Sequence, residues 1–117
     1  MELITKRIIK HDDLAPRHGR LFGGLLLEWL DLDGYKVVKE EFGITEWVTK
    51  AIDGEWKGTV GLGDVLAIRG EVFGQGNTSA TVMIRAYNEY TDDTVWEGSM
   101  TFVRIDENWR PKPIKSV

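Results

Sequence analysis

The sequence has 117 residues, of which 42% are hydrophobic and 29% charged, so it can bury a core, and we expect one globular domain over residues 1–117. It has no cysteine, which excludes a disulfide scaffold, a thiolate zinc site and a cysteine nucleophile, and its two histidines, His11 and His18, cannot form a three-histidine metal site. The net charge of −4 argues against nucleic acid as a partner, although a local basic cluster can still hold a small anionic ligand.

The sequence shows no targeting or membrane-spanning segment. Residues 1–10 mix charges with short apolar pairs, so they lack the long apolar core of a signal peptide. No stretch approaches the ~20 consecutive apolar residues that cross a bilayer. We therefore expect a cytoplasmic protein without a membrane partner.

A strand is predicted over residues 3–10, followed by a loop that contains Pro16 and Gly19. A long helix then begins at Gly23-Gly24, continues to residue 42 and ends at Gly43. Good helix formers fill most of its positions. Its apolar residues cover more than one stripe, so we expect it to be buried on most sides.

Further strands are predicted after the helix, where apolar and polar residues alternate between turn signals. Their expected ranges are residues 47–52, 65–73, 79–90 and 95–105. One long helix among several strands that are joined by short turns indicates an α+β fold. The expected architecture is an antiparallel sheet wrapped around a single helix.

The segment from His18 to Asp31 resembles the start of the central helix in hotdog-fold acyl-CoA thioesterases. The shared pattern is Gly19, three residues, Gly23-Gly24 and then an apolar helix that ends in an aromatic residue and Asp31. Other stretches match the same family in the same order, namely residues 59–65, 76–79, 102–106 and 111–114. The resemblance covers nearly the whole chain and implies the hotdog fold and the hydrolysis of acyl-CoA to a carboxylic acid and CoA.

The resemblance also implies the roles of individual residues. Asp31 is the expected catalytic carboxylate, which activates water or attacks the thioester itself. A helix start has free N–H groups, and glycine lets a substrate oxygen approach them, so Gly23 and Gly24 are expected to form the oxyanion hole. CoA is expected along the turn and the basic C-terminal region, at Gly76, Asn77, Thr78, Ser79, Arg104 and Lys112. No metal and no cofactor other than CoA is implied.

The residues around Asp31 can also be interpreted from physical chemistry alone, independently of the family resemblance. The residue lies among apolar helical neighbours, so its carboxylate is either partly buried, which would raise its pKa, or a solvated helix charge. Glu28 and Asp33 are equally acidic and look like surface positions. The seven residues between Gly24 and Asp31 separate their Cα atoms by roughly 10 Å. We therefore expect a site shared between two chains, in a homodimer at least. The resemblance to thioesterases implies that such dimers can associate further into a hexamer, as a trimer of dimers.

The chain departs from the family at one position. The family usually has an Asn three residues before the first glycine of its pattern, and Pro16 stands there. Proline has neither a side-chain donor nor an N–H group, so Arg17 or His18 is the candidate substitute. Two alternatives follow: a module that binds acyl-CoA without hydrolysing it, and a hotdog hydratase or dehydratase that uses His18 with Asp31.

Overall fold

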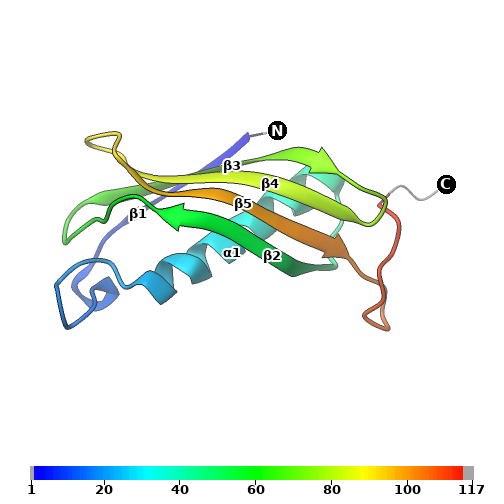
Figure 1. Ribbon diagram of the computed structural model, residues 1–117, viewed down its shortest axis with the longest axis horizontal. Coiled ribbons are helices and arrows are strands. Elements are labelled where there is room, and N and C mark those ends of the chain that lie inside the picture. The colour runs from blue at the N-terminus through cyan, green and yellow to red at the C-terminus, as the bar shows by residue number, and fades with distance from the viewer. Residues whose placement is uncertain (1, 115–117) are drawn as a thin grey trace.

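The computed structural model describes residues 2–114, which form an elongated molecule with one long helix under a curved sheet (Figure 1). Within these residues the chain forms a 3-10 turn, η1, one α-helix, α1, and five strands, β1 to β5. Their bounds are β1 (Glu2–Ile8), η1 (His11–Asp13), α1 (Gly23–Phe42), β2 (Trp47–Trp56), β3 (Val65–Gln75), β4 (Ser79–Asn88) and β5 (Thr94–Arg104). The predicted order of elements is confirmed, although β2 runs four residues beyond its predicted end at residue 52.

The strands form one antiparallel sheet in the order β1-β3-β4-β5-β2. Strands β1 and β2 are therefore its two edges, and α1 lies across the concave side (Figure 1). The register of β2 against β5 shifts between Thr49 and Ala51, which marks a β-bulge. This arrangement confirms the expected α+β hotdog architecture.

Helix α1 has the bounds that its terminal glycines predict. It ends at Gly43, whose φ of 67° is left-handed and whose N–H donates to the Lys39 carbonyl. Leu26, Leu30, Val37 and Val38 form its buried face against the sheet.

The expected burial on most sides of α1 is wrong for the single chain. Leu27 and Leu32 are 40% and 49% exposed. The reason is geometric, since one sheet contacts only one face of a helix.

Gly34 lets α1 approach β5 closely. A Cβ atom at this position would lie 2.9 Å from the ring of Phe102, which is fully buried. The helix is therefore seated on β5 one turn after Asp31, and this contact sets the height of Asp31 above the sheet.

Asp33 corrects the sequence-based expectation, because it is a buried carboxylate rather than a surface one. Its side chain is 4% exposed and accepts two hydrogen bonds from the Arg7 guanidinium, at 2.7 and 3.0 Å. The Thr5 hydroxyl donates a third at 2.5 Å. Arg7 also lies over the Trp29 ring, 5.0 Å from its centroid. Strand β1 supplies these partners from far away in the sequence, so the local pattern around Asp33 did not show them.

Replacing Asp33 by Asn should lower the free energy of unfolding by about 2–3 kcal/mol, because the half-buried Arg7 loses its counter-charge. Asp31→Asn is the matched control: that carboxylate is exposed, so its loss should change stability little. Urea unfolding at one fixed protein concentration measures both variants. Equal stability of the two variants would contradict the structural role of Asp33.

Candidate active site

Asp31 lies on the exposed side of α1, next to the edge strand β2. Its carboxylate accepts a hydrogen bond from the hydroxyl of Thr49. Thr49 pairs with Phe102 and therefore shares the helix-facing side of the sheet with that buried ring. The hydroxyl fixes one oxygen of Asp31 and leaves the other open for a further contact.

The exposed face of α1 carries Gly24 as well as Asp31. Residues seven apart on a helix lie on nearly the same face, and Leu27 falls between these two. Around this face stand exposed apolar side chains of α1, of its N-cap residue and of β2. They are Phe22 at 56%, Leu27 at 40%, Ile52 at 43% and Trp56 at 49% exposure.

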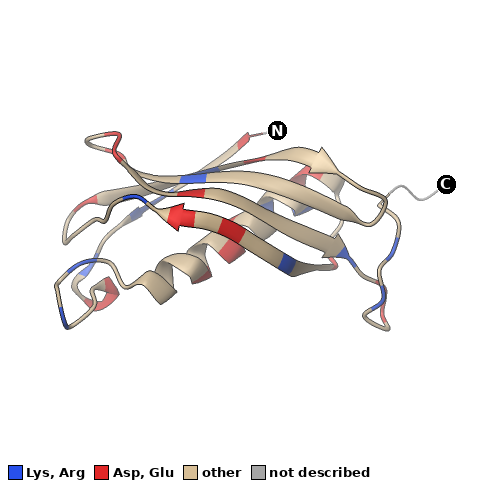
Figure 2. Ribbon diagram, viewed as in Figure 1, with Lys and Arg blue, Asp and Glu red and all other residues tan. Residues whose placement is uncertain are grey.

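The start of α1 leaves backbone donors free. The N-cap residue is Phe22, which offers no side-chain acceptor, and the first turn has no acidic residue. Within residues 2–114, the N–H groups of Gly23 and Gly24 donate no hydrogen bond, whereas those of Leu25 and Leu26 donate to the Phe22 carbonyl. Figure 2 shows this end of the helix without charged residues. The two glycine N–H groups can therefore receive an anionic oxygen.

His18 lies in the loop that precedes α1. Its Nδ1 accepts a hydrogen bond of 3.1 Å from the Arg20 backbone N–H, so the neutral ring carries its proton on Nε2. The loop is closed by backbone hydrogen bonds from Ala15 to the Arg20 carbonyl and from Gly19 to the Ala15 carbonyl. His18 is thus held with a donor on its outer nitrogen, and Pro16 lies in the same loop.

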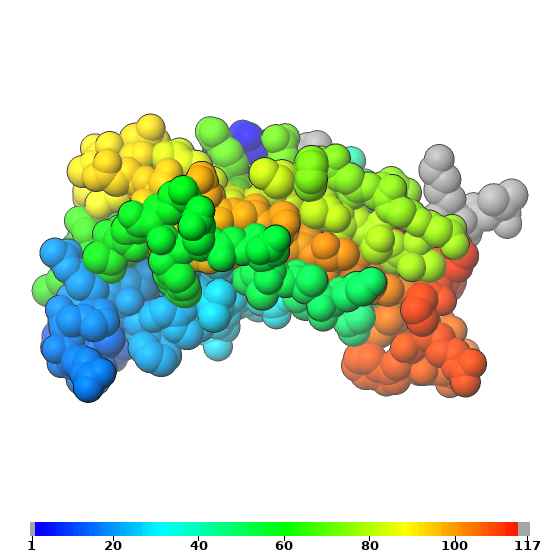
Figure 3. Space-filling model, viewed as in Figure 1, coloured from blue at the N-terminus to red at the C-terminus, as the bar shows by residue number. Residues whose placement is uncertain are grey.

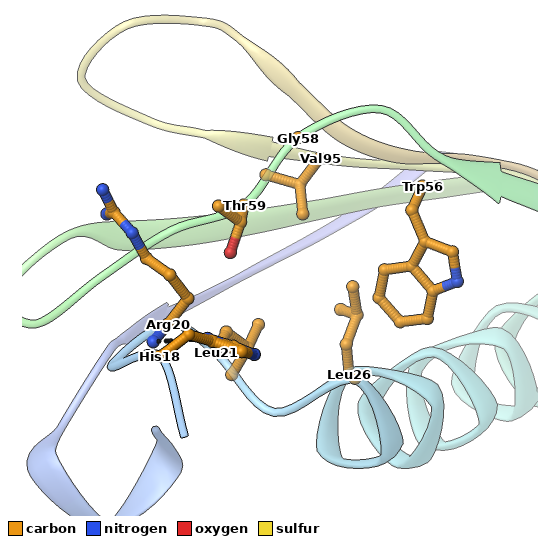
Figure 4. A pocket seen from close by; sticks show the side chains of 9 residues that line it. His18, Arg20, Leu21, Leu26, Trp56, Gly58, Thr59 and Val95 are labelled. Atoms are coloured by element: carbon orange, nitrogen blue, oxygen red, sulfur yellow. Dashed lines mark hydrogen bonds between the residues drawn. The ribbon is translucent and has the colours of Figure 1, made fainter. Parts of the chain in front are cut away.

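A cavity of about 400 Å³ opens beside the helix start (Figure 4). Leu21, Leu26, Trp56 and Val95 provide its apolar lining. The other lining residues are His18, Arg20, Gly23, Gly58 and Thr59. In the space-filling view, the end of β2 and the segment after it (green) stand over the chain around the start of α1 (blue) (Figure 3).

The predicted CoA-contacting residues come together at the opposite end of the molecule. The backbone of Arg104 donates to the Thr78 carbonyl, and that of Ile114 donates to the Asn77 carbonyl, both at 2.8 Å. Lys112 is bonded through its backbone to Arg104. The turn between β3 and β4, with Gly76 and Ser79 at its ends, therefore lies against the C-terminal segment (Figure 1).

The cations of this region are only partly available. The Arg104 guanidinium donates to the Pro113 and Ile114 carbonyls. Glu46, Asp106 and Glu107 line the adjacent hollow together with Arg104 and Lys112. Lys112 is therefore the more accessible of the two predicted cations.

The structure thus groups the predicted site residues into three places. His18, Gly23 and Gly24 meet at the helix start, Asp31 lies farther along α1, and the turn of residues 76–79 lies with Arg104 and Lys112. His18 and Asp31 have different hydrogen-bond partners, Arg20 and Thr49. Among residues 2–114, no cluster of three or more His, Asp or Glu side chains is placed to hold a metal ion.

Sequence reasoning missed Thr49. The available signal was the alternation from Trp47, which puts residues 47 and 49 on the same face of the predicted strand. A hydroxyl on that face can reach a carboxylate on the helix that the strand packs against.

A family model for the thioesterase superfamily matches residues 18–95, more than half of the chain. The chain belongs to the thioesterase superfamily. A hexameric acyl-CoA thioesterase in its apo form is 27% identical, with a TM-score of 0.85 over 96% of this chain and 74% of that one. No curated protein matches significantly.

Two further solved structures share the fold of this thioesterase-superfamily chain at lower identity. A hexameric thioesterase from Yersinia pestis is 23% identical, with a TM-score of 0.87 over 96% of this chain and 93% of that one. An acyl-CoA hydrolase from Staphylococcus aureus, in complex with butyryl-CoA and CoA, is 22% identical, with a TM-score of 0.84 over 96% of this chain and 68% of that one.

Among the described residues, no helix has the length and the apolar composition that a membrane-spanning helix requires.

Proposed function

We propose that the protein is an acyl-CoA thioesterase with Asp31 as its catalytic carboxylate. The observation that carries the proposal is the pairing of Asp31 with Thr49 on the helix face that also presents the free N–H groups at Gly24. A held carboxylate and free N–H donors for an oxyanion are the two parts that hydrolysis of a thioester needs. Membership of the thioesterase superfamily supports the same reaction.

The reaction follows from these parts. Asp31 takes a proton from a water molecule while the water oxygen bonds to the thioester carbonyl carbon. The electron pair of the C=O bond moves to the oxygen, which the N–H groups of Gly23 and Gly24 hold. The pair returns as the C–S bond breaks, and the proton on Asp31 passes to the leaving sulfur. The products are a carboxylic acid and CoA. Direct attack by Asp31, followed by hydrolysis of the anhydride, gives the same products.

One site requires two chains, because Gly24 and Asp31 of one helix are roughly 10 Å apart. The exposed apolar side chains around Asp31 and the open edge of β2 provide a surface for a second copy. A two-fold dimer would bring the helix start of each chain to the Asp31 of the other. The hexameric state named for similar thioesterases supports a trimer of such dimers.

His18 takes the place of the Asn that Pro16 replaces. His18 offers a donor at its Nε2 in the loop before α1 and lines the cavity next to Gly23, whereas Arg17, the other candidate, does not line it. In this role it binds the thioester carbonyl or orients the attacking water. We place the CoA nucleotide along Gly76, Asn77, Thr78 and Ser79, with Lys112 and Arg104 beside it.

The second candidate is a dimer that binds acyl-CoA without hydrolysing it, and Pro16 is the observation that favours it. The hydratase or dehydratase reading has less support, because the family model that matches the chain is that of the thioesterase superfamily.

Steady release of CoA from acyl-CoA substrates tests the proposal. Asp31→Ala should lower kcat/KM about 10³-fold because it removes the general base. Glu28→Gln, which changes a neighbouring exposed carboxylate on α1, is the matched control and should keep full activity. His18→Asn retains a donor and should lose less activity than His18→Ala.

The same assay can reject the proposal. A wild-type protein that releases no CoA from short, medium, long or aromatic acyl-CoAs is not a thioesterase of this class. Tight binding of those esters without turnover would then establish the binding module. Full activity in Asp31→Ala would remove Asp31 from the mechanism.

Mixing two inactive variants tests the shared site. Asp31→Ala removes the carboxylate of a chain, and Gly24→Val obstructs its helix start. When the two are unfolded and refolded together in equal amounts, about half of the dimers are mixed, and each mixed dimer has one intact site. Activity should return to roughly a quarter of the wild-type value. A mixture that is dimeric but as inactive as its parents would contradict a site built from two chains.

A further inference from the structure

We propose that the cavity at the start of α1 binds the acyl chain of the substrate, and that Trp56 limits this chain to medium length. The inference rests on the proposed thioesterase function and adds the class of substrate. The described structure places this cavity at the start of α1, where Gly23 is one of its lining residues.

The position of the cavity fits an acyl chain. Gly23 lines the cavity and is also one of the two residues with a free N–H group at the helix start. A thioester carbonyl held by these N–H groups would therefore have the first carbons of its acyl chain at the cavity mouth. The CoA portion would extend the other way, along the exposed face of α1.

The lining selects an alkyl group over a charged one. Leu21, Leu26 and Val95 are all buried and contribute only apolar atoms. The polar side chains of the lining are His18, Arg20 and Thr59, and the exposed Thr59 donates to the Val60 carbonyl at 3.4 Å. Such a lining favours burial of methylene groups, each of which gains about 0.8 kcal/mol on leaving water.

The nearby cations are directed elsewhere. The Lys57 amino group lies between the Glu55 and Glu97 carboxylates, at 3.2 and 3.4 Å, and these carboxylates raise its pKa. Arg20 packs against Gly61, and in Figure 4 its guanidinium points away from Leu26 and Trp56. Neither Lys57 nor Arg20 therefore directs its charge toward Leu26 and Trp56.

The volume indicates the length of the chain. A closed apolar cavity of about 150 Å³ holds the six carbons of benzene, which is roughly 25 Å³ per carbon. The cavity of about 400 Å³ is open to solvent on one side, so only part of this space encloses a ligand. We expect the best acyl groups to have roughly eight to twelve carbons.

Trp56 forms the solvent-exposed wall of the cavity, beside Gly23. It is the last residue of β2, and its ring lies 3.4 Å from the position of a Cβ atom on Gly23. The ring is 49% exposed, whereas Leu26 is fully buried. Trp56 can therefore be shortened without opening the core, and its removal widens the cavity on this side. Because Trp56 also belongs to the exposed apolar surface that we assign to a second copy, the oligomeric state of Trp56→Ala is measured together with its chain-length profile.

The chain-length profile of kcat/KM, measured with saturated acyl-CoAs from four to eighteen carbons, tests the inference. The wild-type optimum should fall at roughly eight to twelve carbons. In Trp56→Ala, the ratio of kcat/KM for sixteen carbons to that for eight should rise about tenfold, equivalent to about two more buried methylenes. Thr59→Phe adds a ring at an exposed position of the rim and should move the optimum to shorter chains. Trp109→Ala removes an exposed Trp from the C-terminal loop, and its profile should match the wild type.

Two outcomes overturn the inference. One is turnover with an unchanged profile in both Trp56→Ala and Thr59→Phe, which leaves the thioesterase function intact but removes the cavity from it. The other concerns a wild-type protein that turns over no ester, for which affinities for the same acyl-CoAs are measured by calorimetry. Affinities that do not depend on chain length, or that depend on chain length in the same way in the wild type and both variants, would overturn the inference. Affinities that shift with chain length in the two variants as described would support the cavity even without hydrolysis.

Discussion

The rotation of α1 about its own axis is the constraint on which the other features depend. On one side, Gly34 brings the helix against Phe102 in the middle of the sheet. On another side, the Arg7 guanidinium binds both oxygens of Asp33 and ties the helix to edge strand β1. Asp31 is two residues before Asp33, which is about 200° around the helix. A helix that is fixed at Asp33 must therefore present Asp31 to the other edge of the sheet, where Thr49 receives it.

Two acidic residues two positions apart thus have opposite environments. Asp33 is enclosed and bound to a cation, so it contributes to the fold. Asp31 is exposed and bound by a hydroxyl alone, so its carboxylate keeps a free oxygen in a setting that a second chain can complete. Apolar side chains around Asp31 remain open to solvent in the single chain, although the same residue types elsewhere on α1 are buried. The helix is therefore buried on the side that faces the sheet, and its apolar residues remain exposed on the side that bears the proposed catalytic group.

The sequence predicted the fold well because its signals were local. Glycines mark both ends of α1, and alternating residues mark β3, β4 and β5. The end of β2 was predicted too early, since residues 53–55 are polar or glycine and carry no apolar side chain to continue the pattern, while an edge strand tolerates them. The partner of Asp33 was not predictable in the same way, because Arg7 is 26 residues away in the sequence. The contact of Thr49 with Asp31 and the place of Trp56 in the cavity wall were not predicted for a similar reason. Both depend on which face of β2 each side chain occupies.

The bulge in β2 determines those faces. Side chains of a regular strand alternate, so positions 49 and 56, separated by an odd number of residues, would project on opposite sides. The extra residue between Thr49 and Ala51 resets the alternation, and both side chains come to lie opposite inward-facing rings of β5, Phe102 and Trp96. One inserted residue thereby changes the parity of the strand. One end of this edge strand can then hold the proposed catalytic carboxylate, and the other end can form a wall of the cavity. In a strand of the same length without the bulge, these two side chains would project from opposite sides of the sheet.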